Sequence, residues 1–565
     1  MGRNGRMSMP SAHQWEFWRL VFVIFSASFI VQILVLLSVV RFTDFSLCND
    51  PLNSPVAEIR YQIEGTFEPS TRDQGSLFPP SSSLHQQPPT YSKACSHLDT
   101  NFSRDSSPYW TCADEEVTRE LSQPDDKSTS ALGEHSLQPL SIALHPFVKF
   151  STYRLSMNTI LVVGLSSAVY RAFDKPVHDC TWHQEGKDLV TTDAKMIYVK
   201  WDEGRMPYVP AIVNCTFPTA VGADASGGTL QLSISAKPNR LSLTGTVAAN
   251  VYEERKGEVE VFNRMVRKLE QGGAAALPYK YAYCGPPMFG RIRPDWILGW
   301  LTYHYRLYEG MEGKVRFFFY NVGALADEGT LTVLEPFIKA GVVEIVNVLE
   351  IKDYTAHYRG QVLFVNDCLH RTRFIAQWTL FHDFDEFIYV PQPNSLQSLL
   401  KQHEDKAWLT FASLPASWKF CTELSRTVET RWPVERMVCV EEQPECRYKQ
   451  EKPDPWLCTG PLGRRKYVVN PRKVFAAGIH YVTKDSGSGG VDLNGTLARL
   501  HHYHGALATF NYLCNGVANF SARADNTSEF SRYIFNDDVA TETSKARDVL
   551  RRLLVDLLFL LSFHL

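Results

Sequence analysis

The sequence has almost no excess of charge of either sign. Its 58 Lys and Arg residues nearly balance 61 Asp and Glu residues, which leaves a formal net charge of −3. Proteins that mainly bind nucleic acid usually carry a strong positive surplus, so we expect no nucleic-acid partner. Hydrophobic residues make up 44% of the 565 residues, which is enough to bury large cores. The chain is therefore expected to be globular and to form several domains.

Several short motifs are also missing. No Gly-x-x-x-x-Gly-Lys-Ser/Thr loop occurs, and no Gly-x-Gly-x-x-Gly opens a helix after a predicted strand. If the protein binds nucleotide phosphates, a cation and basic side chains must neutralise them in place of a glycine-rich loop. No Cys-x-x-Cys pair is present, which argues against a structural zinc site.

One hydrophobic run is long enough to cross a membrane. Residues 20–40 carry no charge, and as a helix they would span about 31 Å, close to the hydrocarbon thickness of about 30 Å. Three Arg residues precede this predicted transmembrane anchor, so residues 1–19 are expected to be a cytoplasmic tail, with the rest of the chain on the other side. A cleaved signal peptide is the alternative, but no clear small-x-small cleavage site follows. The segment 541–565 is too short and too charged for a second span, and is expected to form an amphipathic C-terminal helix that packs on the domain or on a second subunit.

The cysteines and glycosylation sequons agree with an extracytoplasmic location. The chain has 12 Cys residues, an even number that suits a compartment in which disulfides form. Four of them, between residues 421 and 458, suggest loops linked to one another. Residues 41–139 are rich in Ser, Pro, Gln and Thr and are predicted to be a stem. The five Asn-x-Ser/Thr sequons begin at Asn101, Asn214, Asn494, Asn519 and Asn526.

Residues 140–270 are predicted to form a β-sandwich. Short β-rich runs, such as TILVVGL from Thr159 and LQLSISA from Leu230, alternate with turn signals, which is typical of this fold. Aromatic residues here, including Trp182 and Trp201, could stack on sugar rings, although an aromatic core is the favoured interpretation.

Residues 271–540 are predicted to form an α/β domain with a mostly parallel sheet and helices on both faces. Helical patterns at 294–307 and 361–379 and a helix ending at Gly341 alternate with apolar strands at 315–321 and from Val342. Strand and helix alternation of this kind places ligands at the carboxyl ends of the strands.

The run LFHDFDEFIYV from Leu380 is predicted to be a strand interrupted by acids. Buried strands avoid carboxylates because an unpaired charge is expensive to desolvate. Asp383 and Asp385 are two residues apart, so both could face one hard divalent cation at the strand end and leave room for a diphosphate. An acidic loop between two short strands is the alternative. The basic candidates for the phosphates are Arg291, Arg293, Arg371, Arg373, Arg464, Arg465 and Lys466, of which Arg371 is the best placed.

The order of several motifs resembles glycosyltransferase family 92, and within it most closely the plant β-1,4-galactan synthases. The motifs are VNDCLHRTRFIAQW, FHDFDEFIYVP, WKF, WPVERMVC, RRKYVVNPRKVFAAGIHYV and RLHHYHG. The resemblance covers roughly residues 279–515, and the preceding β-rich region resembles the carbohydrate-binding module of these synthases. It implies a GT-A fold, UDP-galactose as donor, Mn²⁺ as cofactor, and a single-pass type II Golgi membrane protein that extends β-1,4-galactan side chains of pectic rhamnogalacturonan I. A homodimer is plausible by family analogy.

The same resemblance assigns roles to individual residues. Asp383 and Asp385 match the family's metal-binding and diphosphate-binding pair, and His502 is the implied third metal ligand, with His480, His501 and His504 as alternatives. Asp367 is placed on the donor side together with Arg291 and Arg371. Because α-linked donor and β-linked product imply inversion, one base is needed; Glu435 is preferred, with Asp485 and Glu386 as rivals. The predicted acceptor-binding aromatic residues are Trp418, Trp432 and Trp456.

One function of a different class stays open from the sequence. The protein could be a membrane-tethered glycan-binding protein whose β-domain binds the glycan and whose transferase-like domain is inactive. Retention of Asp383, Asp385 and the late histidines favours the enzyme, because an inactive site has no reason to keep closely spaced carboxylates.

Overall fold

The computed structural model describes residues 136–142, 145–167, 173–199, 206–224, 226–238, 245–312, 314–326, 328–354, 357–421, 432–441, 465–507, 513, 516–517 and 533–563. All of them fall within one compact unit. The predicted cytoplasmic tail, the anchor at 20–40, nearly all of the stem and Trp456 lie outside these residues. Within them, no helix is long and apolar enough to cross a membrane.

Two antiparallel sheets follow one another in the first described part of the chain. A disulfide between Cys180 of β4 and Cys215 of β7 joins the two sheets. Trp182 is buried in the core between them, so it packs as a core aromatic residue. One sheet has the order β1 (Gln138–Leu140), β2 (Phe147–Ser156), β3 (Thr159–Ser167), β7 (Tyr208–Thr216) and β6 (Lys195–Tyr198), and the other β5 (Val190–Asp193), β4 (Phe173–His183), β8 (Gly228–Pro238) and β9 (Gly245–Glu254).

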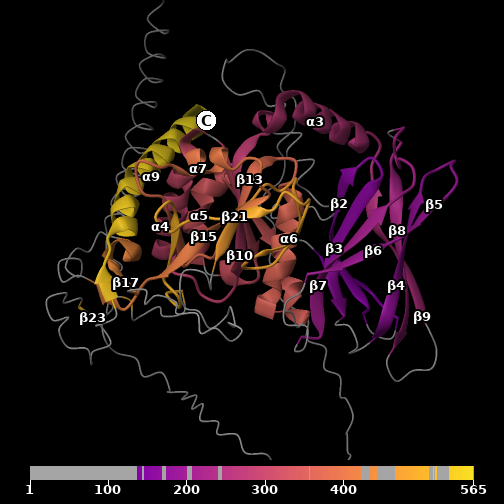
Figure 1. Ribbon diagram of the computed structural model, residues 1–565, viewed down its shortest axis with the longest axis horizontal. Helices are drawn as coiled ribbons and strands as arrows, with labels where there is room; N and C mark the ends of the chain where they lie inside the picture. Colours follow the sequence, from indigo (N-terminus) through magenta and orange to yellow (C-terminus); the bar gives the residue numbers. More distant parts are fainter. Residues whose placement is uncertain are drawn as a thin grey trace, which may run out of the picture. The chain divides into compact units, whose positions relative to one another are not determined.

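Helix α3 (Glu258–Gly272) and a 3₁₀ turn, η1 (Gly273–Ala276), lead into a nine-stranded sheet. Figure 1 shows its strands between the helices. In order along the sheet, the strands are β12 (Val343–Asn347), β11 (Val315–Asn321), β10 (Tyr279–Met288), β13 (Ala376–Phe381), β18 (Lys466–Val469), β15 (Trp408–Pro415), β22 (Arg499–His502) and β14 (Glu386–Tyr389), and β21 (Gly490–Asp492) pairs with β15.

The helices of this part are α4 (Pro294–Leu307), α5 (Glu328–Lys339), α6 (Gln361–Arg371), α7 (Leu396–Gln402) and α9 (Asp538–Phe563). The predicted helix 294–307 is confirmed; it begins with Pro, which suits the first helical position. Short 3₁₀ turns lie at η2 (Gly310–Glu312), η3 (Ala324–Ala326), η4 (Leu349–Asp353), η5 (His357–Gly360) and η6 (Pro433–Arg436).

Of three sequence predictions about this part, one is confirmed and two need correction. The sheet is mostly parallel, as predicted: β12, β11, β10 and β13 are parallel to one another, and β15 is parallel to β21 and β22. It also contains antiparallel pairs, because β18 runs antiparallel to β13 and β15, and β14 runs antiparallel to β22. The helix predicted for 361–379 ends at Arg371, because the following residues join the sheet as β13. The acidic strand is two strands, β13 and β14, which a turn at His382–Asp385 separates. β14 then leaves the side of β13 and pairs with β22.

Alternating side chains of the central strands point to opposite faces of the sheet, as strand geometry requires. On one face, Tyr281, Tyr283 and Phe317 pack in a core with α4, α5, α7 and α9. On the other face, Ala282 and Phe318 pack in a core with α6 and with residues of β2 and β3. Helices therefore cover both faces, and the first five-stranded sheet contacts the outer side of α6.

Helix α6 is fixed by covalent and polar contacts. A disulfide joins Cys368 of α6 to Cys284 of β10. Tyr153 of β2 donates a hydrogen bond of 2.6 Å to Asp367. The first residue of α6 is therefore held at the carboxyl end of β10 and β13.

The C-terminal helix α9 lies alongside α4 (Figure 1) and also contacts η6. Of the four cysteines between 421 and 458, Cys421 is disulfide-bonded and Cys439 is a buried free thiol. The remaining short strand pairs are β16 (Phe420–Cys421) with β23 (Gly516–Val517), β17 (Cys439–Glu441) with β24 (Tyr533–Phe535), and β19 (Val474–Ala477) with β20 (Val482–Asp485).

Candidate active site

A tight turn at the carboxyl end of β13 carries the acidic motif. The backbone N–H of Glu386 donates to the Asp383 carbonyl at 3.1 Å, and the Asp383 N–H donates to Oε2 of Glu386 at 2.6 Å. Glu386 is fully buried. Its side chain therefore closes the turn on which the two aspartates stand.

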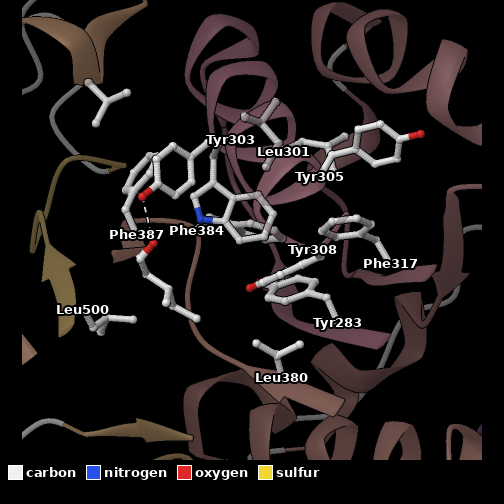
Figure 2. Packing of buried hydrophobic residues seen from close by; sticks show 14 of the residues in the cluster. Tyr283, Leu301, Tyr303, Tyr305, Tyr308, Phe317, Leu380, Phe384, Phe387 and Leu500 are labelled. Carbon is white, nitrogen blue, oxygen red and sulfur yellow. Dashed lines mark hydrogen bonds between the residues drawn. The ribbon is translucent and has the colours of Figure 1, made fainter. Parts of the chain in front are cut away.

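Buried aromatic residues bind the carbonyl groups of this turn. Trp296 Nε1 donates to the Phe384 carbonyl, Trp300 Nε1 to the Glu386 carbonyl and Tyr283 Oη to the His382 carbonyl, all within 2.9 Å. Figure 2 shows Phe384 and Tyr283 within this packed cluster. Because the buried carbonyls are satisfied and Phe384 points into the core, the turn has a defined backbone that presents Asp383 and Asp385.

Asp383 is held from two other elements. Lys466, the first residue of β18, places Nζ at 2.7 Å from Oδ2, and Gln361, the first residue of α6, donates to Oδ1 at 2.8 Å. The Lys466 side chain is only 2% exposed. Burial opposes ionisation of Asp383, but the Lys466 ammonium outweighs it and holds the pKa of that carboxyl below its usual value.

Asp385 has the opposite balance of effects. Burial, followed by the negative charge of Asp383, raises the pKa of Asp385 to about 7. A positive charge placed beside it would favour the ionised form. The carboxylate pair is therefore suited to a bound cation, because the protein's own groups do not fully stabilise both negative charges.

His502 is the late histidine that lies beside the acidic turn. Its Nε2 is 3.8 Å from Asp385 Oδ1, and its Nδ1 is 3.8 Å from Glu386 Oε1. The three alternatives have other contacts, although the charge of His480 also lowers the pKa of Asp383. His501 is buried near Arg499 and Asp538, His480 Nδ1 contacts the Arg465 carbonyl, and the His504 ring centre is 5.3 Å from that of His502.

The donor groups of this site are of the kinds that bind divalent cations, but in the structure they do not surround one point. Across the described ranges, no three His, Cys, Asp or Glu side chains already converge in the way that metal ligands do. Asp385 and His502 nevertheless bring a carboxylate and an imidazole to within 3.8 Å, and Asp383 stands two residues away on the same turn. Carboxylate and imidazole are acceptable ligands for Mn²⁺, so these three residues are the ones that would hold it.

The sequence analysis gave Lys466 only as a candidate contact for the phosphates, whereas the structure pairs it with Asp383. It did not assign Gln361 or the turn-closing role of Glu386 to the site. Lys466 had a detectable signal, because it starts the apolar strand KYVV, where a charge requires a partner. Gln361 had no such signal in the sequence, because its hydrogen bond to Asp383 depends on how α6 packs against the turn.

The predicted donor-side role of Asp367 and Arg371 is wrong. Arg371 bonds to Asp367 Oδ2, and the same carboxylate accepts hydrogen bonds from Tyr153 and Tyr320. Both side chains are at most 1% exposed. They form a buried ion pair within α6, to which Tyr153 of β2 and Tyr320 of β11 also bond, so the pair is not open to a nucleotide. Arg291, by contrast, is exposed just after β10, at the same edge of the sheet as Asp383.

Neither Glu435 nor Asp485 is placed to act as the base. Glu435 is 2% exposed and pairs with Arg547 of α9 at 2.9 Å, so it is an internal ion pair. Asp485 accepts hydrogen bonds from the N–H groups of Gly487 and Gly489. It also pairs with Val474, whose carbonyl contacts Arg373 just before β13. Asp485 therefore lies at the amino end of the sheet, opposite to Asp383.

The predicted acceptor-binding tryptophans separate into two groups. Trp418 is half-buried and donates through Nε1 to the His504 carbonyl at 3.0 Å, which places it next to the His502 region. Trp432 packs against Gly299 of α4. Trp418 is therefore the described tryptophan that can contribute to a binding surface near the acidic residues.

Comparisons with known proteins agree on one family. The sequence profile of glycosyltransferase family 92 matches residues 279–543, which include the central sheet and the acidic turn. Galactan beta-1,4-galactosyltransferase GALS2 of Arabidopsis thaliana is 30% identical over 383 residues, 67% of this chain and 68% of that protein. Galactan beta-1,4-galactosyltransferase GALS1 of the same plant is 29% identical over 71% of this chain and 75% of that protein. Among solved structures, the alignment with the galactosyltransferase LgtC covers 34% of this chain and 58% of the LgtC chain. The sequence identity is 15% and the TM-score is 0.19.

Proposed function

Because this chain belongs to glycosyltransferase family 92, we propose that it is an inverting β-1,4-galactosyltransferase of GT-A type. Its donor is UDP-galactose, and its acceptor is the growing end of β-1,4-galactan. The observation that carries the proposal is the turn at His382–Asp385, which presents two carboxylates beside His502 at the carboxyl edge of the sheet. The relatives named as galactan beta-1,4-galactosyltransferases support the sugar and the linkage.

Mn²⁺ is the proposed cofactor, and Asp385, His502 and Asp383 are the residues that would hold it. When bound, the ion would neutralise charge on the diphosphate leaving group. Lys466 and Gln361 keep the Asp383 carboxylate in a fixed orientation through contacts of 2.7 and 2.8 Å. Arg291, exposed at the same edge, is the proposed basic contact for the phosphates. These contacts orient the site before the donor arrives, which reduces the cost of binding.

The acceptor is proposed to bind beside Trp418. Sugar rings present apolar C–H patches that pack on an indole ring, while their hydroxyl groups bind polar atoms at its edge. The hydrogen bond from Trp418 Nε1 to the His504 carbonyl fixes the indole next to the strand that carries His502. This position supports an acceptor site adjoining the metal residues.

We also propose that the residues after the hydrophobic segment 20–40 lie in the Golgi lumen. This proposal rests on the charge pattern around that segment, the even number of cysteines, and disulfides such as Cys180–Cys215 and Cys284–Cys368. Protease protection of intact Golgi vesicles, probed with an antibody to the catalytic domain, tests it. Digestion without detergent would contradict the topology.

A donor panel tests the reaction. The full chain is incubated with several UDP-sugars and a β-1,4-galactan oligomer, with and without EDTA, and the product is subjected to linkage analysis. We expect UDP release only with UDP-galactose, loss of release in EDTA, recovery with added Mn²⁺, and a new β-1,4 bond. Transfer of another sugar, or the same rate in EDTA, would contradict the donor or the cofactor.

Variants separate an enzyme from an inactive glycan-binding protein. Asp383→Ala and Asp385→Ala should each reduce galactose transfer about 100-fold or more, because each removes a carboxylate from the proposed metal site. Asp405→Ala is the matched control, since Asp405 is 68% exposed and precedes the amino end of β15. Equal UDP release from wild type, Asp383→Ala and Asp385→Ala would refute the enzyme.

A further inference from the structure

The two nitrogen atoms of His502 face two different carboxylates. Nε2 is directed toward Asp385 Oδ1 and Nδ1 toward Glu386 Oε1, each at 3.8 Å. The strand register produces this arrangement, because His502 of β22 lies directly opposite Glu386 of β14 in an antiparallel pair. Opposite residues in such a pair have Cβ atoms about 5 Å apart on the same face of the sheet.

The two carboxylate oxygens of Glu386 differ in their hydrogen bonding. Oε2 accepts the Asp383 N–H at 2.6 Å and lies 3.6 Å from Lys466 Nζ. Oε1 is buried and has no hydrogen-bond partner among the described residues. A buried carboxylate oxygen without a donor is unfavourable. The donor group nearest to it in these contacts is the Nδ1 side of the His502 ring.

We infer that Glu386 is a positioning residue that accepts the Nδ1–H of His502 and thereby leaves the Nε2 lone pair facing Asp385 for a divalent cation. A metal-binding histidine commonly donates its other N–H to a carboxylate, which fixes the tautomer and the ring orientation. Here a ring shift of about 1 Å would shorten the Nδ1 to Oε1 distance to hydrogen-bond length. The inference rests on the proposed function, since it concerns the metal site of that reaction.

This role assigns His502, and not its neighbours, as the metal-binding histidine. His501 projects to the opposite face of β22, where Phe387 is its strand partner. His480 contacts the Arg465 carbonyl through Nδ1 and acts on Asp383 through its charge, but it lies between β19 and β20 and not on the strand that pairs with Glu386. His502 alone among these three has one ring nitrogen near each of two carboxylates within the described residues. Glu386 also cannot be the base suggested by the sequence, because it is fully buried and closes the turn.

Mn²⁺ binding to the full chain, measured by calorimetry without nucleotide, tests the role independently of activity. Glu386→Gln retains an oxygen for the Asp383 N–H but turns an NH₂ group toward Nδ1. His502 must then accept at Nδ1 and carry its proton on Nε2. We expect a 10-fold to 100-fold weaker Mn²⁺ affinity, with the melting temperature in EDTA close to that of wild type. His501→Gln is the matched control and should bind Mn²⁺ as wild type does.

A double-mutant cycle separates action through His502 from direct ligation. In a His502→Ala background, Glu386→Gln should change Mn²⁺ affinity less than twofold, because the residue through which it acts is absent. The same loss in both backgrounds, or wild-type affinity in Glu386→Gln alone, would overturn the role. Nitrogen-15 spectra of the histidine-labelled wild-type chain provide a second readout that needs no buried substitution. With the signal identified by its loss in His502→Gln, a proton on Nδ1 supports the role and a proton on Nε2 overturns it.

These outcomes differ from failure of the proposed function. Normal Mn²⁺ binding without galactose transfer would contradict the proposed reaction and leave the role of Glu386 intact. A wild-type chain that binds no Mn²⁺ would overturn both the metal site and this role. Full transfer together with equal Mn²⁺ affinity of wild type and Glu386→Gln would overturn only the role of Glu386.

Discussion

Lys466 Nζ lies 2.7 Å from Asp383 Oδ2, and the lysine is almost completely shielded from solvent. The contact joins the first residue of β18 to the turn after β13, two strands that are antiparallel neighbours. Lys466 also lies 3.6 Å from Glu386. The Lys466 ammonium group therefore offsets part of the negative charge of the acidic turn. Removing it would leave the Asp383 and Glu386 carboxylates without this positive charge.

Lys466→Met is expected to destabilise the folded chain. Breaking a buried ion pair by removing one partner costs about 3–5 kcal/mol, and the lower end applies because the Asp383 side chain is 28% exposed. Urea denaturation in EDTA measures the change in the free energy of unfolding. Lys466→Met combined with Asp383→Asn should recover part of the loss, since the second change removes the charge that the first one exposes. No difference between wild type and Lys466→Met would show that the pair contributes nothing.

The sequence predicted the strands that form the centre of the sheet, because these strands are continuous apolar runs with clear ends. It predicted less well wherever a contact between distant segments decides the structure. Residues 372–379 fit a helical pattern locally, yet Ala376–Phe381 pairs with β10 and β18. The antiparallel strand β18 was not predicted for the same reason, since its partner β13 lies far earlier in the sequence.

For the candidate site too, some residues could be predicted from the sequence and others could not. The acidic residues could be found because three carboxylates in an apolar run need compensation, and Asp383 and Asp385 do lie together near His502. Arg371 could not be judged from the sequence, because a buried arginine and an exposed one look alike until Asp367, Tyr153 and Tyr320 are seen around it. Glu435 failed for the same reason, because its partner Arg547 is 112 residues away.

Trp418→Ala should weaken acceptor binding more than donor binding. The indole lies beside His504 through a 3.0 Å hydrogen bond, and covering the apolar face of a sugar contributes about 25 cal/mol for each Å² of apolar surface removed from water. We expect the KM for a galactan oligomer to rise several-fold, while the KM for UDP-galactose stays within twofold. Trp432→Ala is the comparison, since Trp432 packs on α4 and should lower stability without separating the two KM values. A rise in only the donor KM would contradict the placement of the acceptor.

Glu435→Gln is expected to retain galactose transfer and to lose stability. Glu435 pairs with Arg547 at 2.9 Å in a buried setting between η6 and α9. Leaving Arg547 without its charge partner should cost about 1–3 kcal/mol, with the rate of transfer within a few-fold of wild type at a temperature where both chains are folded. Chemical denaturation and transfer kinetics measure the two effects. Near-complete loss of transfer with unchanged stability would restore Glu435 as the base.

The stability of the folded chain should fall as the pH decreases below about 6.5. Burial lowers the pKa of His178 to about 4 and that of His304 to about 3, so the unfolded chain takes up these protons first. Above pH 6.5 both histidines are neutral in the folded and unfolded chain, and their contribution to stability is complete. This contribution is lost progressively as the pH falls toward the pKa values of the folded chain. For His178 alone the loss at pH 5.5 is about 1.4 kcal/mol. The free energy of unfolding, measured at several pH values from 5 to 8, should change less with pH in His178→Gln than in wild type. The same pH dependence in both proteins would contradict the assignment.

Loss of the disulfide between Cys284 and Cys368 should affect both stability and the site. The bond closes a separation of 84 residues between β10 and α6, and removing such a bond typically costs about 2–5 kcal/mol. It also holds the helix whose first residue, Gln361, donates to Asp383, so the double Ser variant should bind Mn²⁺ more weakly at temperatures where it remains folded. The matched control is the double Ser variant of Cys180 and Cys215, which removes a bond between the two sheets of the β-rich region. That control should lose stability to a similar degree and keep wild-type Mn²⁺ affinity, because its bond does not include α6. Equal Mn²⁺ affinities for the two variants would show that α6 keeps Gln361 in place without its covalent link to β10.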